Sequence, residues 1–524
     1  MLNGVNRVVV IIQARMNSSR LRGKIMANIE DHPMLYHIVE RAKAIREVNE
    51  VVIATTVGKS DDVVLEWARA NKCEAFRGSE EDVLKRFFDA ASKYKADIII
   101  RICADSPLFD PGLTSEMVRT IIKSDGDFVV LKNNQPSLNG GVNVFSFRSL
   151  KKASENASKP YQREHVIPYL VENRKMFKIV PVAQYPKFIR NDLRLTVDTY
   201  SDLKLVREIY KHLYKIGELV ELGDVIKLLD KNPTILKINS HVKSIGPGRP
   251  GFRILIMVAS NQRIGYGHLF RMLNLAKTLT EQFANGVEFL IDGDVFAKDL
   301  IFKNYFRFTT VSLGNLQNFP WSKFNAVVID SHEDKLIRLF RKINNKVLGV
   351  SYDNKKNSKF ADVSFAPIDQ KVEGVYSGLK YLILGHRQNI SLTKPDINNN
   401  KVRKYLLISF GAADPKNYTL KIAQMLLDWG VSIPIALLIG PFYKHRETLS
   451  RFKKNYPKVK VLENVNLDHV FSQTKIAICY FGVTMFEMIS SGIVCGVTSV
   501  NEHQLESVKF LRKSGVFFDL GMVD

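Results

Sequence analysis

The stretch VVVIIQARMNSSRLRGK, residues 8–24, decides the fold of the first half of the chain. Its apolar, β-branched run from Val8 to Ile12 predicts a short buried strand. Ligands of open α/β sheets bind beyond the carboxyl ends of strands, where cations, hydroxyls and backbone N–H groups can hold phosphate oxygens. The segment therefore predicts a phosphate site, with a solvated basic turn as the alternative for the cations alone. The loop that would form it contains Arg15, Ser18, Ser19, Arg20, Arg22, Gly23 and Lys24.

Outward from this segment, strand-like runs alternate with helical patterns to about residue 230. This alternation predicts an α/β domain with a parallel-rich sheet and helices on both faces. The predicted strands are Val8–Ile12, Val51–Thr55, Ile98–Ile102 and Asp127–Leu131. The predicted helices are Met34–Ala44, Asp61–Asn71, Glu81–Tyr94, Asp198–Leu213 and Glu218–Leu229.

A break at SIGPGRPG, residues 244–251, separates two halves, because this glycine- and proline-rich run can continue neither a helix nor a central strand. A new strand, Phe252–Val258, follows it. The polar run KPDINNNK precedes a third start at KYLLISFG. We expect domains at 1–243, 252–390 and 391–524, with a linker at 244–251. Further strands are predicted at Val287–Leu290, Ala326–Ile329, Lys346–Val350, Tyr405–Ser409, Ile433–Ile439, Val459–Leu462 and Ile476–Tyr480.

The bulk composition indicates a globular protein of several domains. Of the 524 residues, 45% are hydrophobic and 25% charged. No signal peptide and no membrane-spanning run is visible, and four scattered cysteines suit a reducing cytoplasm. The net charge of +23 would attract polyanions, yet the lysines are spread along the chain and no nucleic-acid-binding motif is present. A basic scaffold or nucleic-acid binder is the alternative from another class.

Two carboxylates in the first half suit a metal ion. Asp105 and Asp198 each follow a predicted strand, and magnesium takes one or two carboxylates together with substrate phosphate oxygens. For each residue alone, a turn role for Asp105 or a helix cap for Asp198 is an equally simple interpretation.

Together, these segments resemble the cytidylyltransferases that make CMP-sugars, above all the spore-coat-polysaccharide type. The motifs ARMNSSRLRGK, GSEEDVLKR, RICADSPLFDP, REHV and RLTVDTYSDL occur in the family's order. The resemblance implies a Rossmann-like, GT-A-like nucleotidyltransferase that transfers a cytidylyl group from CTP to an acidic sugar. It also implies Mg²⁺ held by Asp105 and Asp198, and catalytic roles for Arg15 and Lys24. The implied CTP-binding residues are Ala14, Arg15, Ser19, Arg20, Lys24, Thr55, Ser79, Asp82 and Arg86.

The sequence departs from the family pattern at the sugar-acceptor side. The family segment there carries an Asp and a Glu before Val-Phe-Ser, whereas this chain has GGVNVFS, with Gly141 and Asn143 at those places. Arg22 replaces a proline and Ala104 a glycine. The specificity for the acceptor is therefore left open.

A second phosphate-type loop opens the other half of the chain. The string IGYGHLFRMLNLA, residues 264–276, follows a predicted strand and continues at helical spacing. Glycines let helix N–H groups approach an anion. His268 in this string has an unperturbed pKa near 6.5 and can accept a proton at neutral pH, although a helix cap is the simpler alternative.

This half resembles the UDP-sugar hydrolase of the pseudaminic acid pathway, a two-lobed GT-B-like α/β fold. Further matches are VVIDS, SFGAADPKN and YFGVTMFE, followed by Asn501–Gln504. The resemblance implies that His268 is the catalytic base and that UDP contacts Gly265, Gly267, Gly411, Gly482, Thr484 and Glu487. A glycosyltransferase is the alternative for this half.

Taken together, the two resemblances predict a fused enzyme of surface-glycan synthesis, of the nonulosonic acid type. One half would activate an acidic sugar with CTP, and the other would hydrolyse a UDP-linked deoxy-amino sugar. The expected partners are these small substrates, with neither nucleic acid nor a membrane, and a homo-oligomer stays open.

Overall fold

The chain divides into two compact units, one of residues 1–249 with 280–284 and the other of residues 250–279 with 285–524. The computed structural model describes residues 7–132, 137–243, 251–261, 265–310, 313–330, 335–343, 346–352, 359–368, 373–385, 403–465, 467–500 and 502–523. Within these ranges, no helix has the length and apolarity to cross a bilayer. The predicted linker at 244–251 lies almost wholly outside them.

The first unit is built on a seven-stranded mixed sheet. Strands β5, β4, β1 and β6 run parallel, β8 is antiparallel to both of its neighbours, and β9 is parallel to β7. β1 lies between β4 and β6, so the loop after it opens at the middle of the carboxyl edge. In spatial order the strands are β5 (Glu74–Gly78), β4 (Glu50–Thr56), β1 (Val8–Gln13), β6 (Ile98–Cys103), β8 (Val142–Ser146), β7 (Phe128–Leu131) and β9 (Ile179–Val182).

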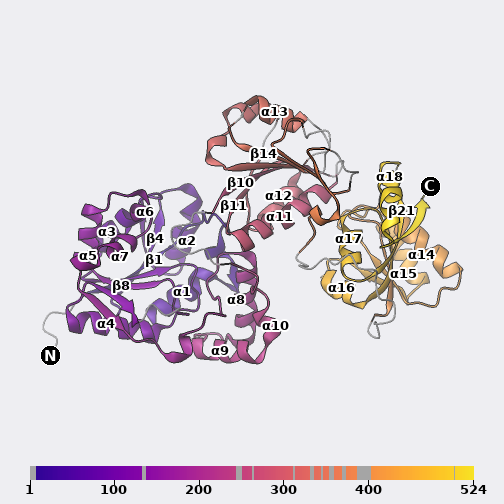
Figure 1. Cartoon of the computed structure of the whole chain (residues 1–524). Helices are drawn as coiled ribbons and strands as arrows, with labels where there is room; N and C mark the ends of the chain where they lie inside the picture. Colours follow the sequence, from indigo (N-terminus) through magenta and orange to yellow (C-terminus); the bar gives the residue numbers. More distant parts are fainter. Residues whose placement is uncertain are drawn as a thin grey trace. The chain divides into compact units, whose positions relative to one another are not determined.

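Helices cover both faces of this sheet. In Figure 1, α3, α5, α6 and α7 gather on one side of it and α1 and α4 on the other. The first face packs through a core that includes Ile99 of β6, Phe87 of α3 and Leu150 of α5. The helices are α1 (Met34–Lys43), α2 (Asp62–Ala70), α3 (Val83–Lys93), α4 (Pro111–Ser124), α5 (Phe147–Asn156), α6 (Pro160–Glu164), α7 (Pro168–Glu172), α8 (Tyr200–Leu213), α9 (Leu222–Lys231) and α10 (Pro233–Leu236). A short ribbon of β2 (Asn28–Ile29) and β3 (His32–Pro33) precedes α1.

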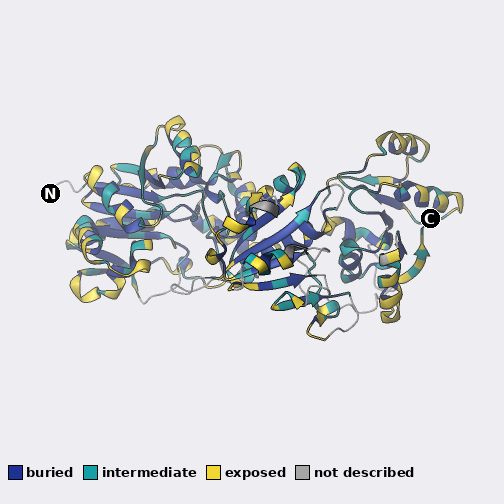
Figure 2. Cartoon of the chain, turned by 90° about the horizontal axis from the view of Figure 1, so that it is seen from above, coloured by how far each residue is buried: buried dark blue, intermediate teal, exposed yellow. Residues whose placement is uncertain are grey.

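The second unit contains two parallel sheets, whose central strands are mostly buried and whose outer strands are more exposed (Figure 2). The seven strands of the first are, in spatial order, β12 (Arg307–Thr310), β11 (Gly286–Gly293), β10 (Arg253–Ser260), β13 (Ala326–Asp330), β14 (Leu348–Tyr352), β15 (Val363–Ala366) and β16 (Tyr376–Ser377). Its helices are α11 (Gly267–Phe283), α12 (Val295–Lys303) and α13 (Lys335–Ile343).

The other sheet of this unit has six strands and repeats the same alternation. In spatial order they are β19 (Lys460–Leu462), β18 (Ile435–Leu438), β17 (Tyr405–Ser409), β20 (Thr474–Tyr480), β21 (Val494–Ser499) and β22 (Phe518–Met522). The helices are α14 (Tyr418–Asp428), α15 (Arg446–Asn455), α16 (Leu467–Gln473), α17 (Val483–Ser490) and α18 (Glu502–Leu511).

The prediction of an α/β protein with a parallel-rich N-terminal sheet is confirmed, and most predicted strands lie within a residue or two of their positions. The helix predicted from Glu218 is wrong at its start, because α9 begins at Leu222. The carbonyl of Val220 accepts a hydrogen bond from Arg41 Nη1 at 2.7 Å, and the chain before Leu222 is not helical. The GT-B-like pairing of two lobes stays a prediction, as do the exact domain bounds.

Candidate functional site

A buried carboxylate holds the loop after β1. Asp61 Oδ1 accepts a hydrogen bond from the Met16 N–H at 2.8 Å. Its Oδ2 accepts from the hydroxyls of Thr55 at 2.9 Å and Thr56 at 2.6 Å. Charge-assisted hydrogen bonds are about twice as strong as neutral ones. Asp61 therefore fixes the backbone that presents the cations, and Thr55, a predicted CTP residue, supports the loop through Asp61.

Lys24 lies at the centre of this site and is buried, with 8% of its surface exposed. Its Nζ donates to Asp105 Oδ2 and Asp198 Oδ1, both at 3.1 Å, and to the Val197 carbonyl at 2.7 Å. Burial opposes protonation of the amine, but the two carboxylate charges outweigh it and raise the pKa of Lys24. The two predicted metal carboxylates therefore converge on one ammonium group.

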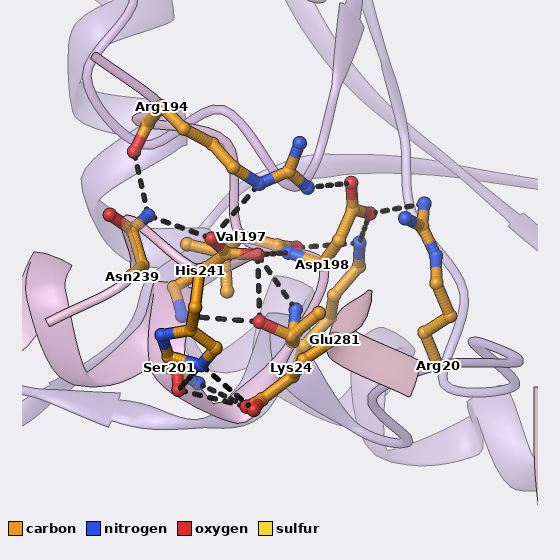
Figure 3. A network of polar contacts seen from close by, with 11 residues as sticks. Arg20, Lys24, Arg194, Val197, Asp198, Ser201, Asn239, His241 and Glu281 are labelled. Carbon is orange, nitrogen blue, oxygen red and sulfur yellow. Dashed lines mark hydrogen bonds and ion pairs between the residues drawn. The ribbon is translucent and has the colours of Figure 1, made fainter. Parts of the chain in front are cut away.

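Asp198 binds three cations, as Figure 3 shows for Lys24, Arg20 and Arg194. Arg20 Nη2 lies 2.8 Å from Oδ1, and Arg194 Nη2 lies 2.8 Å from Oδ2. Burial disfavours the carboxylate, but these positive charges prevail and hold the pKa of Asp198 well below its usual range. An ionised Asp198 thus lies among three positively charged side chains, two of which also bind other carboxylates.

Residues at the start of α8 hold Asp198 in place through hydrogen bonds. Thr199 is the N-cap residue, in a capping box with Asp202, so the interpretation of Asp198 as the helix cap is wrong. Asp202 Oδ2 accepts the backbone N–H of Asp198 at 3.1 Å and of Thr199 at 2.9 Å. Its Oδ1 accepts from Arg194 Nε at 3.0 Å and Asn239 Nδ2 at 2.8 Å. The buried Asp202 therefore orients both Asp198 and its cation Arg194.

A further carboxylate, Glu281 of the first unit, holds the first turn of α8 (Figure 3). Its Oε1 accepts from the Ser201 N–H at 3.2 Å and the Ser201 hydroxyl at 2.8 Å. Its Oε2 lies 3.1 Å from His241 Nε2. A negative group at a helix N-terminus is favourable, so Glu281 stabilises the turn that follows Asp198.

Arg86, a predicted CTP residue, is fully buried beside Ser79. Its Nη1 donates to the Ser79 carbonyl at 2.6 Å, while Nε and Nη2 have no hydrogen-bond partner in the part of the chain that the structure describes. Burial and the positive charge of Arg15 lower the pKa of Arg86 to about 10. A Cβ at Gly78 would lie 2.7 Å from Arg86 Cγ, so only glycine admits this side chain. Two unsatisfied buried donors near Arg15 suit an anion.

The remaining predicted CTP residues lie around the same strand ends. Ala14 is buried and Ser19 is exposed. Asp82 caps α3 by accepting the Lys85 N–H at 2.9 Å, and it also accepts from Arg163 Nε at 3.0 Å. Protein groups therefore engage the Asp82 carboxylate, and a nucleotide contact by these side chains stays a prediction.

Sequence reasoning missed several residues of this site. Asp61, Arg194 and Asp202 gained no predicted role, because each lies in a stretch whose helix or loop pattern gave no chemical signal. Asp202 had one available sign, since Thr199 and Asp202 are spaced as a capping box, and that spacing predicts a fixed helix start.

In the second unit, the structure places His268 in the first turn of α11 against Asp330 at the end of β13. Nδ1 of His268 lies 2.8 Å from Asp330 Oδ1, and both residues are buried. Arg271 binds the same carboxylate through Nε to Oδ2 and Nη2 to Oδ1, each at 2.6 Å.

Asp330 and Arg271 together position the His268 ring. Burial opposes ionisation of Asp330, but the charge of Arg271 and the hydrogen bonds from Arg271 and His268 lower the pKa of Asp330 below its usual value. Nδ1 of His268 lies 2.8 Å from both Asp330 Oδ1 and Arg271 Nη2, so it either donates to the carboxylate or accepts from the guanidinium. In the tautomer in which Nδ1 donates to Asp330, Nε2 is the imidazole atom able to accept a proton.

The predicted UDP residues lie in loops at the carboxyl ends of β10, β17 and β20. Gly265 and Gly411 have left-handed φ values of 91° and 80°. A Cβ at Gly411 would lie 2.7 Å from the Tyr480 ring. Gly267 begins α11, and Gly482 is the N-cap residue of α17. Of the residues in the matching strings, Ile264, Ser331 and Asn501 lie outside the described residues.

Thr484 and Glu487 lie on α17. Glu487 Oε1 accepts the Gly385 N–H at 3.3 Å, and a Cβ at Gly385 would lie 3.7 Å from Asn274 Nδ2 of α11. The helix that carries His268 and the helix that carries Glu487 therefore approach each other at Gly385. Convergence of the UDP residues on His268 itself stays a prediction.

An aromatic contact lies beside His268. The Tyr266 ring stacks on Phe442 with centroids 4.3 Å apart, and Phe296 packs edge-on against both. The Tyr266 hydroxyl donates to Asp294 Oδ2 at 2.6 Å. Phe442 follows β18 of the six-stranded sheet, so this cluster joins the His268 loop to the other sheet of the unit.

The fold and first site together define a class. A Rossmann-like α/β domain with cations after its central strand and carboxylates at the neighbouring strand ends belongs to the nucleotidyltransferases. The cytidylyltransferase family model matches residues 9–221. Through this N-terminal region the chain belongs to the cytidylyltransferase family.

Several known proteins are similar in sequence to part of this chain. An uncharacterized protein of Methanocaldococcus jannaschii is 39% identical over 237 residues, 45% of this chain and 96% of its own. The spore coat polysaccharide biosynthesis protein SpsF of Bacillus subtilis is 29% identical over 235 residues, 44% and 96% of the two chains. The 3-deoxy-manno-octulosonate cytidylyltransferase of Geotalea daltonii is 32% identical over 114 residues, 21% and 44%.

Proposed function

We propose that the first unit transfers a cytidylyl group from CTP to an acidic sugar and releases pyrophosphate. The observation that carries this proposal is the convergence of Asp105 and Asp198 on Lys24, with Arg20 in the same cluster. The family match supports cytidylyl transfer, and the name of the Geotalea relative supports a sugar acid as acceptor.

In the proposed reaction, an oxygen of the sugar hydroxyl attacks the α-phosphorus of CTP. The bond from that phosphorus to the bridging oxygen breaks, pyrophosphate leaves with the bonding electrons, and the hydroxyl loses its proton. Such a transfer needs alignment and neutralisation of charge more than covalent help. Arg15, Arg20 and Lys24 would bind the triphosphate, and the unsatisfied N–H groups of Arg86 would bind the nucleotide.

The carboxylate pair fits a divalent cation. Asp105 Oδ2 and Asp198 Oδ1 both lie 3.1 Å from Lys24 Nζ, so a cationic group already lies between them, and a divalent cation bound by both oxygens would take the place of this ammonium group. Mg²⁺ commonly takes one or two such carboxylates and completes its shell with phosphate oxygens and water. Bound there, Mg²⁺ would neutralise charge on the phosphates. Asp202 and Arg194 keep Asp198 oriented in either case.

A nucleotide screen on the full chain tests this function. Thermal unfolding is followed with CTP, UTP, UDP and UMP, and pyrophosphate release is followed with CTP, Mg²⁺ and 3-deoxy-manno-octulosonate. Ligand at a hundredfold excess over its Kd should stabilise the unit that binds it by about 2.7 kcal/mol. Absence of any CTP effect on the first unit would reject the proposal.

For the second unit, we propose hydrolysis of a UDP-linked deoxy-amino sugar. The supporting observation is the pairing of His268 Nδ1 with the buried Asp330, and Nε2 would act as the base in the tautomer in which Nδ1 donates. His268 would take a proton from water as the water oxygen bonds to the anomeric carbon and UDP departs. Proton transfer of this kind typically contributes about 10²–10⁴-fold.

Labelled water separates hydrolysis from glycosyl transfer. With a UDP-sugar in oxygen-18 water, a hydrolase releases free sugar that carries the label, whereas a glycosyltransferase yields free sugar only slowly without an added acceptor. Both proposed reactions use cytoplasmic nucleotides, and both fit one route to a surface glycan of the nonulosonic acid type.

A further inference from the structure

Arg101 of β6 is a cation whose hydrogen-bonding partners are all neutral. Its Nε and Nη2 donate to Gln13 Oε1 at 3.2 and 2.9 Å, and its Nη1 donates to Asn143 Oδ1 at 2.9 Å. A guanidinium has five N–H donors. Three are used here, so one N–H on Nη1 and one on Nη2 remain.

The place of Arg101 is the carboxyl edge of the central strands. Ile99, two residues earlier, packs in the core with α3, so Arg101 projects from the same face of the sheet. It precedes Asp105 by four residues, and all three members of the Gln13–Arg101–Asn143 contact are partly exposed. Arg101 is thus reachable from the site that contains the two converging carboxylates.

Other positive groups lie close by. Burial lowers the pKa of His165, Glu164 opposes this, and the charges of Arg101 and Arg15 lower it further, which places both arginines within electrostatic range of His165. Arg15 also acts on the buried Arg86, where Asp61 and Glu80 oppose it. Arg15 and Arg101 thus supply positive charge near His165 that an anionic ligand can use.

Two features of this chain keep Arg101 without a carboxylate. Here Gly141 has a φ of 83°, and a Cβ on it would lie 2.3 Å from Ser106 Oγ, so no acidic side chain fits. Asn143 supplies a neutral amide oxygen in the same register as Arg101.

We propose that Arg101 binds the carboxylate of the sugar acceptor and determines the specificity of this chain for acidic sugars. Gln13 and Asn143 hold the guanidinium in place, and its remaining N–H groups suit the two oxygens of a carboxylate. The inference rests on the proposed cytidylyl transfer and adds the residue that selects its acceptor.

The decisive experiment measures steady-state kinetics of the full chain with CTP and 3-deoxy-manno-octulosonate, alongside its C1 amide as the uncharged probe. Arg101→Gln should raise the KM for the acid by about 10- to 100-fold, because a charge-assisted hydrogen bond is lost. The Kd for CTP should change less than about threefold. Arg101→Lys keeps the positive charge but loses the planar guanidinium with its paired N–H groups. Its KM for the acid should therefore lie between the values for the wild-type chain and for Arg101→Gln.

A second variant leaves Arg101 in place. Asn143→Asp is isosteric and puts a carboxylate at the oxygen that now accepts from Nη1, which neutralises the cation and repels an acid. It should raise the KM for the acid by about tenfold and leave the amide unaffected. Arg174→Gln, which removes an exposed arginine of the same unit, is the matched control and should change neither constant.

Each outcome decides the proposal. An equal loss of CTP binding and acid binding in Arg101→Gln would assign Arg101 to the nucleotide and overturn the proposal, while cytidylyl transfer stands. Wild-type chain that binds CTP but uses the amide as well as the acid, or uses neither, would also overturn it. Absence of CTP binding in the wild-type chain would instead reject the proposed function itself.

Discussion

The two candidate sites each contain an ionised aspartate, before α8 in the first unit and at the end of β13 in the second, and use it in opposite ways. Asp198 of the first unit binds three cations, Lys24, Arg20 and Arg194. Asp330 of the second binds one guanidinium and one imidazole, from Arg271 and His268. The pKa of each carboxylate lies below its usual value, since nearby positive charge outweighs burial.

The difference between the sites teaches what each can do. Around Asp198 three cations face three carboxylates, because Lys24 also binds Asp105 and Arg194 also binds Asp202. Around Asp330 one guanidinium and one imidazole share a single carboxylate, and Nδ1 of the imidazole contacts both of the other groups. One arrangement suits neutralisation of a polyanion, and the other suits proton transfer.

The largest expected effect follows from removing a carboxylate of the first pair. Asp105→Ala and Asp198→Ala should each lower pyrophosphate release from CTP by more than about 10³-fold, because each removes a hard ligand for Mg²⁺ and a partner of Lys24. Chelation of divalent cations in the wild-type chain should give a loss of similar size.

Unfolding must be distinguished from lost chemistry. Asp198→Asn keeps the shape of the side chain, and its thermal unfolding shows whether the fold survives. Sugar release from a UDP-sugar should be unchanged in these variants. Full pyrophosphate release in Asp105→Ala or Asp198→Ala would contradict the metal assignment. The contrast between a phosphate-binding first site and a proton-transferring second site would then lose its support.

His268→Asn tests the proposed general base of the second unit. Asparagine is polar and compatible with a helix start, but it cannot accept the proton, so sugar release should fall by about 10²–10⁴-fold. UDP should still bind, since Gly482, Thr484 and Glu487 are untouched. Hydrolysis at the wild-type rate would reduce His268 to a structural residue. A matching loss of UDP binding would assign it to the nucleotide instead.

The stability of the second site should depend on pH through Asp330. Its folded-state pKa is lowered, so the unfolded chain binds more protons near pH 4 and the stabilisation is lost as pH falls through the folded-state pKa. Asp330→Asn should cost about 3 kcal/mol at pH 7, because it leaves Arg271 unpaired.

The gap in unfolding temperature between wild type and Asp330→Asn should narrow below pH about 4. Glu447→Gln, which removes an exposed carboxylate of the same unit, should cost less than about 0.5 kcal/mol at either pH. A gap that is constant with pH would mean that Asp330 is not the ionised partner.

Much of the fold was predictable, because hydrophobic periodicity and the turn residues that bound each element are local features of the sequence. β1, which ends at Gln13, and β10, which follows the break at residue 251, both lie where apolar, β-branched runs predict a strand. β8 was not predicted as a strand, although its segment was noted as the sugar-acceptor side of the family pattern. It runs antiparallel to β6, and nothing in the short run VNVFS distinguishes that direction from a parallel strand.

Asp105 follows β6 as the sequence indicated, but in the described residues no strand immediately precedes Asp198, which lies in the loop before α8. The contact of Lys24 with both carboxylates was not predicted, because the three residues lie far apart in sequence. Arg101 could not be assigned, because its meaning depends on two neutral neighbours from other strands, Gln13 and Asn143. A sequence gives the charge of a side chain, but the partners that leave this charge uncompensated come from tertiary pairing.

The phosphate loop offers a smaller test of the division between the units. Arg15→Ala or Lys24→Ala should raise the Kd for CTP by about 10- to 100-fold through loss of a charge-assisted hydrogen bond. The Kd for UDP should not change. Equal effects on both nucleotides would mean that the two sites are not separate. Arg148→Ala, an exposed arginine paired with Asp125 and Asp127, is a control for loss of positive charge alone.

The smallest expected effect concerns the support behind Asp198. Thr199 caps α8, and its hydroxyl donates to Asp202 at 3.0 Å. Thr199→Ala should destabilise the first unit by about 1 kcal/mol, the usual cost of a lost N-cap, whereas Thr199→Ser should retain most of it. Thr234→Ala, at an exposed position in α10, is the matched control and should cost almost nothing.

A functional readout makes this last test specific. Because Asp202 binds the backbone N–H groups of both Asp198 and Thr199, a looser cap should shift Asp198 and raise the KM for CTP a few-fold. None of the residues proposed to act on a UDP-sugar lies in α8, so the release of sugar from a UDP-sugar should be unchanged. If Thr199→Ala lowers stability but leaves the KM for CTP as in wild type, the first turn of α8 stabilises the fold without positioning Asp198. The carboxylate would then owe its place to Lys24, Arg20 and Arg194 alone, and the first site would resemble the second in depending only on its direct partners.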